Sequence, residues 1–131
     1  MPSKTPPTNG RLQFLVCEQV REEANGKHTL LGFFPGEEIK LLAAPPVFIQ
    51  LALMFIFKDG VGAFDVAFDM EVPGPTQPFP RQQLGSISII AGKTAVFSLN
   101  MQAFPVQSIG EHKVRLQLDR EQYARSFTVV R

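Results

Sequence analysis

The chain alternates apolar and polar residues in short segments that are separated by turn signals. The clearest example runs from Phe48 to Met70, where the apolar segments FIQLALMFIFK and VGAFDVAFDM flank Asp59-Gly60. Asp-Gly is a preferred pair for a two-residue hairpin turn, and closing the turn there places Phe55 opposite Phe64 on one apolar face. A slip of one residue would turn the carboxylates into the core. The pattern therefore predicts a hairpin with one buried face.

Two further hairpins are predicted by their turns. Asn25-Gly26, a strong hairpin signal, joins RLQFLVCEQVREEA to KHTLLGFF, and Arg120-Glu121 joins EHKVRLQLD to QYARSFTVV. Between these hairpins, TAVFSLNMQAF alternates apolar and polar residues as a half-buried strand does. The expected opposite partners are Cys17 with Phe34, Glu18 with Phe33, Val114 with Phe127, and His112 with Val129.

Together these patterns predict strands throughout and no long helix. Short strands separated by turn signals are typical of a β-sandwich or a small barrel. We expect an all-β fold, an antiparallel β-sandwich of about eight strands, because segments such as ALMFIF need cover on one face and tolerate partial cover on the other. Residues 1–10 hold three of the eleven prolines and no periodicity. They are predicted to form a flexible N-terminal arm before a single domain over residues 11–131.

Composition and charge exclude several classes of protein. The chain is 44% hydrophobic with twelve Phe, which excludes a largely disordered protein. Its thirteen basic and twelve acidic residues are balanced, which argues against nucleic acid or a membrane surface as a partner. Residues 1–10 lack the apolar core of a secretory signal, and the apolar run around 47–57 is well short of the ~20 residues of a membrane-spanning helix. We therefore expect a cytoplasmic protein.

Two segments resemble known sequences. LVCEQVREEANGKHTLLGFFPGE (Leu15 to Glu37) resembles the opening of an uncharacterised family of small bacterial β proteins, which start with a Cys-Glu pair, a Gly-Lys hairpin and a TLLG-aromatic strand. GEHKVRLQLDRE (Gly110 to Glu121) is similar to the penultimate strand of many immunoglobulin-like sandwiches, with His112 where tyrosine is usual. The resemblance implies an immunoglobulin-like β-sandwich and no known activity, so it assigns no catalytic residue.

The sequence lacks the patterns of common catalytic and metal sites. Cys17 is the only cysteine, which excludes an internal disulfide and a thiolate zinc site, and burial in an apolar strand would raise its pKa. Asp65, Asp69 and Glu71 share one strand face, but the first two would lie ~13 Å apart, too far to share a metal ion. Residues 91–94 (AGKT) lack the first glycine of a phosphate loop. We expect no enzyme activity, no metal and no cofactor.

Glu18 and Arg125 each interrupt an apolar column. In the expected register Glu18 shares a face with Val16 and Val20, where a carboxylate needs a partner or a raised pKa. One interpretation is that the two charges compensate each other or, with His112, line a small polar pocket between the sheets. The alternative is a β-bulge that turns each side chain outward.

The second face of the 48–70 hairpin is more apolar than a water-facing sheet. Either residues 37–46, a short helical turn or an irregular crossover, cover this face, or a partner does, because exposed apolar patches mark interfaces. Its members are Phe48, Ala52, Met54, Ile56, Ala63 and Ala67.

The loop over residues 73–83 is a further candidate contact. Pro75 and Pro78 have Pro-x-x-Pro spacing with Phe79 beside them, and such segments can bind aromatic grooves as polyproline ligands. The alternative for this loop is a plain mobile connection.

The sequence thus predicts a non-enzymatic β-sandwich that acts as a protein-binding or structural module. Its expected partner is another protein or a second copy of the chain. The alternative function is a small-molecule-binding or weakly catalytic pocket between the sheets, around Glu18, Arg125 and His112.

Overall fold

The computed structural model describes residues 4–131 and shows an all-β sandwich of two sheets. The predicted all-β sandwich is confirmed, with nine strands; the immunoglobulin-like character stays a prediction. The strands are β1 (Gln13–Glu22), β2 (His28–Phe33), β3 (Glu38–Lys40), β4 (Val47–Phe57), β5 (Gly62–Glu71), β6 (Phe79–Ile89), β7 (Ala95–Val106), β8 (Gly110–Leu118) and β9 (Glu121–Val130). Three short 3-10 turns are η1 (Asn9–Arg11), η2 (Ala24–Gly26) and η3 (Pro35–Glu37).

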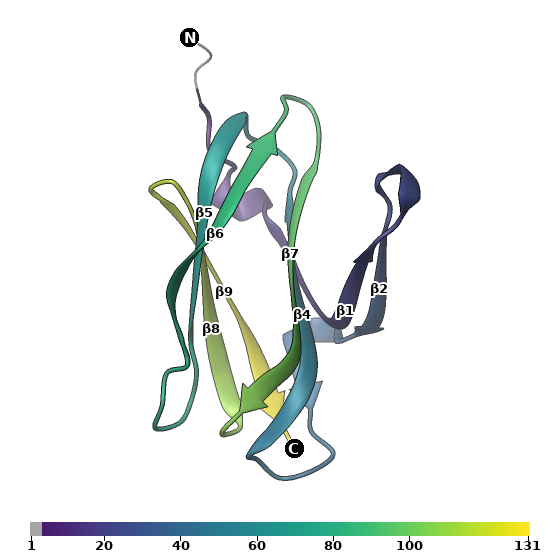
Figure 1. Ribbon diagram of the computed structural model, residues 1–131, viewed down its shortest axis with the longest axis vertical. Helices are drawn as coiled ribbons and strands as arrows, with labels where there is room; N and C mark the ends of the chain where they lie inside the picture. The colour runs from purple at the N-terminus through teal and green to yellow at the C-terminus, as the bar shows by residue number, and fades with distance from the viewer. Residues whose placement is uncertain (1–3) are drawn as a thin grey trace.

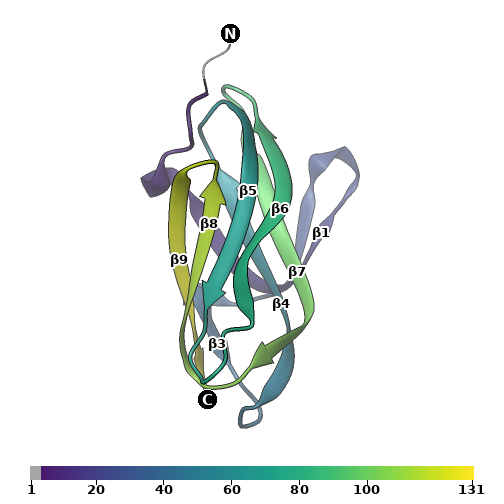
Figure 2. The same cartoon turned by 60° about the vertical axis from the view of Figure 1, so that its left-hand side comes forward.

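The two sheets differ in size and share one core. The four-stranded sheet has the order β2-β1-β4-β7, and the five-stranded sheet has the order β3-β9-β8-β5-β6. Figure 2 shows β9, β8, β5 and β6 in front of β4 and β7. All pairings are antiparallel except that of the short β3 with β9. Because the chain crosses repeatedly between the sheets, most pairings join strands that are distant in sequence.

The Asp59-Gly60 turn joins strands of different sheets, so the predicted central hairpin is wrong. β4 pairs with β1 and β7, whereas β5 pairs with β6 and β8. Phe55 and Phe64 are nevertheless both buried in the main core cluster, because both sheets turn their apolar faces to this core. Alternation fixes which face of a strand is apolar, but it does not say whether the next strand lies beside it or across the core. Asp59 accepts hydrogen bonds from Thr8, a contact that local sequence does not indicate.

The first predicted hairpin, β1–β2, is present with a register one residue from the prediction. Cys17 lies opposite Phe33 rather than Phe34. The turn contains η2 and is therefore longer than a two-residue turn. A shift of one residue exchanges the faces of a strand, and the Glu18 side chain consequently lies over Gly32.

The last predicted hairpin, β8–β9, is also present, with a register two residues from the prediction. Val114 lies opposite Arg125 rather than Phe127, because the turn is tighter than expected and Leu118 pairs with Glu121. A shift of two residues keeps every side chain on its predicted face. The core positions of this hairpin were therefore predicted correctly although their partners were not.

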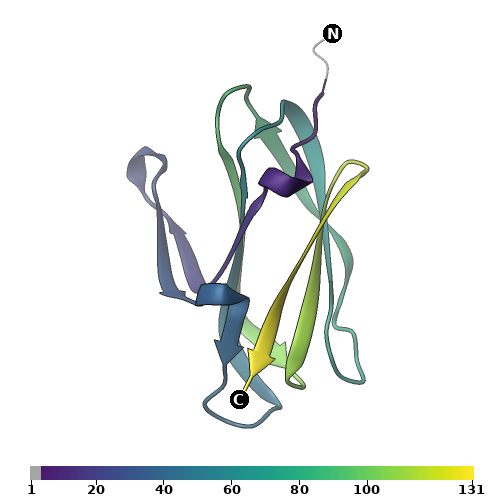
Figure 3. The ribbon, with the colours of Figure 1, turned by 180° about the vertical axis from the view of Figure 1, so that it is seen from behind.

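The outer half of the β1–β2 hairpin bends out of its sheet. Figures 1 and 3 show it as a projection from the sandwich on the side of β4 and β7. Val20 reaches β7, where its backbone is hydrogen-bonded to the Asn100 side chain. A second apolar cluster forms beneath the bend, from Cys17, Val20, Ala52 and Met54.

Residues 4–10 are bound to the sandwich, which corrects the prediction of a flexible arm over residues 1–10; residues 1–3 lie outside the described part. Thr5 and Val61 exchange backbone hydrogen bonds of 2.9 and 2.8 Å. The buried Tyr123 hydroxyl donates to the Pro7 carbonyl at 2.6 Å. The hydrophobic pattern of the sequence does not indicate these contacts, because the arm is held through its backbone and by residues distant in sequence.

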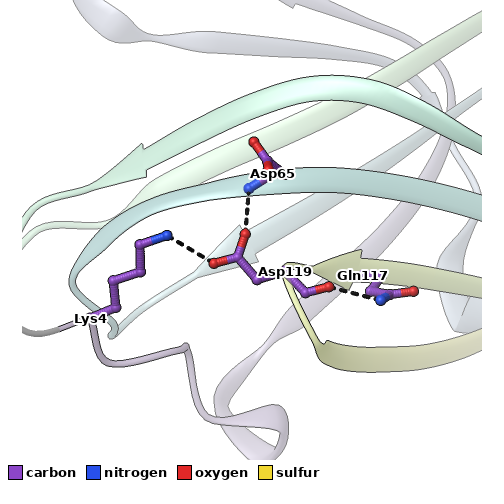
Figure 4. A network of polar contacts seen from close by, with 4 residues as sticks. All are labelled: Lys4, Asp65, Gln117 and Asp119. Carbon is purple, nitrogen blue, oxygen red and sulfur yellow. Dashed lines mark hydrogen bonds and ion pairs between the residues drawn. The ribbon is translucent and has the colours of Figure 1, made fainter.

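Lys4 extends this attachment to the β8–β9 turn. Its ammonium group donates to the Asp119 carboxylate at 2.9 Å, and the Asp65 backbone N–H donates to the other carboxylate oxygen at 2.8 Å (Figure 4). The Gln117 side chain donates to the Asp119 carbonyl at 2.8 Å. The turn, β5 and the N-terminal arm are therefore joined through one aspartate.

Candidate functional site

An apolar groove opens at the end of the sandwich where the C-terminus lies. It has a volume of about 520 Å³ and lies between β3, the loop over residues 41–46 and the start of β4. Figures 1 and 3 show that loop close to the C-terminus, at the opposite end of the molecule from the N-terminus. Most of its lining is apolar and includes Phe34, Ile39, Leu41, Val47, Phe48 and Ile49.

The groove has a buried floor and an exposed apolar rim. Ile39 and Leu41 are buried, whereas Leu42 is 100% exposed and Phe48 is 75% exposed. The Leu41 N–H donates to the Val130 carbonyl at 2.8 Å, which prolongs the pairing of β3 with β9 by one residue. The chain then leaves the sheet, so Leu42 has no strand neighbour to cover it. The sequence thus places large apolar side chains in water at this end of the molecule.

Glu18 and Lys40 are the charged residues of the groove lining. Glu18 lies on β1 of the four-stranded sheet, and Lys40 lies on β3 of the five-stranded sheet. Neither side chain forms a salt bridge with any of residues 4–131. The groove lining therefore combines apolar side chains with one acidic and one basic group that come from different sheets.

Glu18 is held outward by its position over Gly32. Gly32 has a φ of +64° inside β2, and a Cβ atom there would collide with the Glu18 carboxyl group. Glu18 is exposed, so it needs no buried partner. Of the two interpretations of this residue, the outward orientation agrees with the structure, but the predicted β-bulge does not, because the pairing of β1 with β2 and β4 keeps its register around Glu18.

The structure does not bring Glu18, Arg125 and His112 together. The Arg125 guanidinium donates to the Asn9 side chain and carbonyl at 2.8 and 2.7 Å, and to the Leu12 carbonyl at 3.3 Å. It thus holds the N-terminal segment against the edge of β9. The predicted charge compensation between Glu18 and Arg125 is wrong, because Arg125 donates to acceptors of the N-terminal segment and no salt bridge within residues 4–131 joins it to Glu18.

His112 is buried in an aromatic part of the core. Its ring stacks on Phe127 with a centroid distance of 4.8 Å and lies 5.9 Å from the Phe104 ring. Nδ1 lies 3.1 Å from the Gly110 carbonyl, while Nε2 has no hydrogen-bond partner among the described residues. Burial lowers the pKa of the imidazole, and the hydrogen bond to Gly110 opposes that shift. His112 is therefore a neutral core residue and lines no pocket with Glu18.

The outer face of β4 is covered within the chain, which corrects part of the predicted contact surface. Met54 is only 3% exposed and lies in the second apolar cluster, with Ile56 packed half-buried against it. The cover comes from the bent β1–β2 hairpin and not from residues 37–46. Phe48, at the start of the same strand, stays exposed. On β5 of the other sheet, Ala63 is exposed and Ala67 is buried.

The proline loop between β5 and β6 is held by two glutamine side chains. Gln77 exchanges hydrogen bonds of 2.9 and 2.8 Å with the backbone of Val72. Gln107 accepts from the Thr76 hydroxyl at 2.7 Å and donates to its carbonyl at 2.9 Å. The loop is also shorter than predicted, because β6 begins at residue 79. The predicted mobile connection is therefore an anchored turn.

The residues predicted for polyproline docking have different environments. Pro75 and Pro78 are exposed. Phe79 is half-buried and stacks on Phe104 with a centroid distance of 5.2 Å. Since its ring is packed against the core, Phe79 does not extend the exposed Pro-x-x-Pro surface.

Cys17 behaves as the sequence predicts. It is fully buried, and burial is the main cause of its raised pKa. Within residues 4–131 no three His, Cys, Asp or Glu side chains are grouped as metal ligands would be. The same residues contain no helix long and apolar enough to cross a membrane.

Sequence reasoning missed Leu42 and the neighbouring groove residues. The pattern of IKLLAAPP indicates a helical turn or an irregular crossover, and it assigns these apolar residues to no contact surface of their own. A signal was available: the second leucine stands next to Ala-Ala-Pro-Pro, where Pro46 cannot donate a backbone hydrogen bond to a strand. An apolar residue at such a break has no sheet to cover it.

Comparison with known proteins places the chain in a family. Residues 12–130 match the model of a family of unknown function, DUF6941. The chain belongs to DUF6941. The predicted membership of an uncharacterised family is thereby confirmed. No curated protein matches this DUF6941 member.

Solved structures similar to this DUF6941 chain include two of the β-glucosidase from Listeria innocua, in complex with glucose and with gluconolactone. Each has a TM-score of 0.42 and 9% sequence identity. Each comparison covers 92% of this chain and 16% of the β-glucosidase chain. The chain thus spans about a sixth of the length of these enzymes, and a similarity at this level carries no functional argument.

Proposed function

We propose that the protein is a non-enzymatic binding module that holds a protein partner, either a different protein or a second copy of the chain, in the apolar groove. The observation that carries the proposal is the exposure of Leu42 and Phe48 on the rim of a groove whose floor is Ile39 and Leu41. Apolar area removed from water contributes about 25 cal/mol per Å². A partner that covers this rim gains that contribution, and contiguous exposed apolar groups mark interaction sites.

The roles of the polar side chains elsewhere support a binding module. Asp59, Asp119 and Arg125 hold the N-terminal arm, and Asn100 holds the first hairpin. These groups stabilise the fold through hydrogen bonds within the chain. The exposed apolar rim of the groove has no such role within the fold.

The volume of the groove favours keeping the small-molecule alternative as a second candidate. Ligand sites commonly enclose about 300–1,000 Å³ and have mostly apolar walls with few polar groups, which describes this groove. Glu18 would then be the polar group that orients the ligand, without Arg125 or His112.

Site-specific photo-crosslinking in cells tests the proposal. Phe48 is replaced by a benzoyl-phenylalanine, and in a matched control the same group replaces Ile90, which is 62% exposed in the turn between β6 and β7. We expect a defined protein adduct from position 48, no such adduct from position 90, and loss of the adduct when Leu42→Glu is added.

The adducts separate the candidate functions by mass spectrometry. A protein adduct that depends on Leu42 supports the binding module. An adduct of small mass supports the small-molecule alternative instead. The same set of adducts from positions 48 and 90 would show nonspecific labelling and would overturn the proposal.

A further inference from the structure

We propose that the occupant of the groove is a second copy of this chain, bound about a two-fold axis that runs along the groove. The inference rests on the proposed function and names its partner. A two-fold interface must be self-complementary, because the same patch faces itself. This patch contains both parts that such an interface needs: projecting side chains, Leu42 and Phe48, beside a hollow lined by Ile39 and Leu41.

The charges of the groove have the arrangement that two-fold pairing requires. Glu18 belongs to the four-stranded sheet and Lys40 to the five-stranded sheet, so they come from different walls. Rotation about an axis along the groove places the Glu18 wall of one copy against the Lys40 wall of the other. Both charges then gain a partner of opposite sign, and neither has one among residues 4–131 of its own chain.

The overall charge of the chain also permits self-association. The formal net charge is +1 at pH 7, so two copies approach without strong mutual repulsion. The apolar contacts between rim and floor supply affinity, and the two symmetry-related pairs of Glu18 and Lys40 fix the orientation.

Sedimentation velocity over a range of protein concentrations tests the dimer. We compare wild type with Phe48→Glu and with Ile90→Glu, which adds the same charge at an exposed apolar residue away from the groove. We expect wild type and Ile90→Glu to dimerise equally and Phe48→Glu to stay monomeric. Since both side chains are exposed, the two variants and the wild type should unfold alike at protein concentrations too low for the dimer to form, where dimerisation adds no stability; this excludes a folding defect.

Charge reversal tests the orientation. Glu18→Lys and Lys40→Glu should each weaken the dimer severalfold, because each places like charges opposite one another in both halves. The double variant should recover the wild-type dissociation constant, since it exchanges the signs of the pairs. Failure of the double variant to recover affinity would overturn the two-fold arrangement.

Failure of the dimer can be distinguished from failure of the proposed binding function. A wild-type protein that sediments as a monomer at every concentration, yet gives a Leu42-dependent adduct with a different protein from position 48, overturns the second copy and retains the binding module. A monomer with no such adduct overturns both. A dimer that survives Phe48→Glu unchanged also overturns the inference, because it must use another surface.

Discussion

Asn100 presents its side-chain amide to the backbone of Val20 as a neighbouring strand would. The Val20 N–H donates to Asn100 Oδ1 at 2.8 Å, and Asn100 Nδ2 donates to the Val20 carbonyl at 3.0 Å. β1 and β7 are not neighbours in the sheet, so this pair of hydrogen bonds holds the bent hairpin across the sheet. Gln77 makes the same pair of hydrogen bonds with Val72, so side-chain amides stabilise both the bent hairpin and the proline loop.

Replacing Asn100 by alanine should loosen the β1–β2 hairpin. Two hydrogen bonds of about 0.5–1.5 kcal/mol each are lost, so we expect the free energy of unfolding to fall by about 1–3 kcal/mol. Urea denaturation measures this loss, and hydrogen exchange of the Val20 amide should accelerate. Gln102→Ala, at an exposed position of the same strand, is the control. An unchanged Val20 exchange rate would show that the hairpin is held by packing alone.

Gly32 should tolerate no side chain without a loss of stability. Its φ of +64° costs an L residue about 1–2 kcal/mol, and a Cβ atom would also displace the Glu18 carboxyl group. Gly26 is a matched control, because its φ is +74° and no atom lies within 4 Å of a Cβ built there. In urea denaturation we expect Gly32→Ala to cost more than Gly26→Ala. Adding Glu18→Ala to Gly32→Ala should remove the difference, and equal costs of the two single variants would contradict the contact.

The face of each strand could be predicted from the sequence, but the neighbouring strand often could not. Phe55 and Phe64 were correctly assigned to the core, and their assignment as opposite partners in one hairpin was wrong. Alternation reports burial, which two facing sheets satisfy as well as two paired strands. The β8–β9 hairpin shows the same limit, since a tight turn and a looser turn bury the same face when their registers differ by two residues.

The candidate site was predicted in part. Phe48 was identified because an apolar residue on the outer face has no cover in a sheet. Met54 was placed on the same surface wrongly, because its cover comes from the bend of β1 over β4, which depends on Asn100 of another strand. The partners of Arg125 lie in the arm. The arm is bound through contacts between residues far apart in the chain, such as Arg125 and Asn9, which are 116 residues apart. No local pattern carries such information.

Tyr123→Phe should weaken the attachment of the N-terminal arm. The hydroxyl donates to the buried Pro7 carbonyl, which would be left without this partner, at a cost of about 1–3 kcal/mol. Burial also raises the pKa of Tyr123 to about 12, so the phenol stays protonated and the effect should be constant between about pH 6 and about pH 9. Deletion of residues 1–8 should abolish the effect of Tyr123→Phe in urea denaturation. Additive losses would show that the hydroxyl acts elsewhere.

The arm should detach in acid. Hydrogen bonds from the Thr8 hydroxyl and backbone lower the pKa of Asp59, and those from the Asp65 backbone and Lys4 lower the pKa of Asp119. A lowered folded-state pKa means that the stabilisation is fully present above the unfolded value, about 3.9, and is lost as pH falls through the folded values. Exchange of the Thr5 amide should therefore accelerate relative to core amides below about pH 4. Asp59→Asn should show part of this acceleration already at neutral pH; an arm equally protected in both proteins would contradict the role of Asp59.

His112 should make the core sensitive to mild acid. Burial lowers the pKa of its imidazole below the ordinary 6.5, so the folded state favours the neutral ring. Stability from this group is fully present above the unfolded pKa of about 6.5 and is lost as pH falls below it towards the folded value, because protons bind preferentially to the unfolded chain. His112→Phe keeps a ring against Phe127 and removes the unpaired Nε2 atom, so its unfolding free energy should fall less between about pH 7.5 and about pH 5. His28→Gln, which changes the other histidine at a partly exposed position, is the control. Urea denaturation at several pH values gives the two slopes, and identical slopes for wild type and His112→Phe would place the pH dependence on other groups.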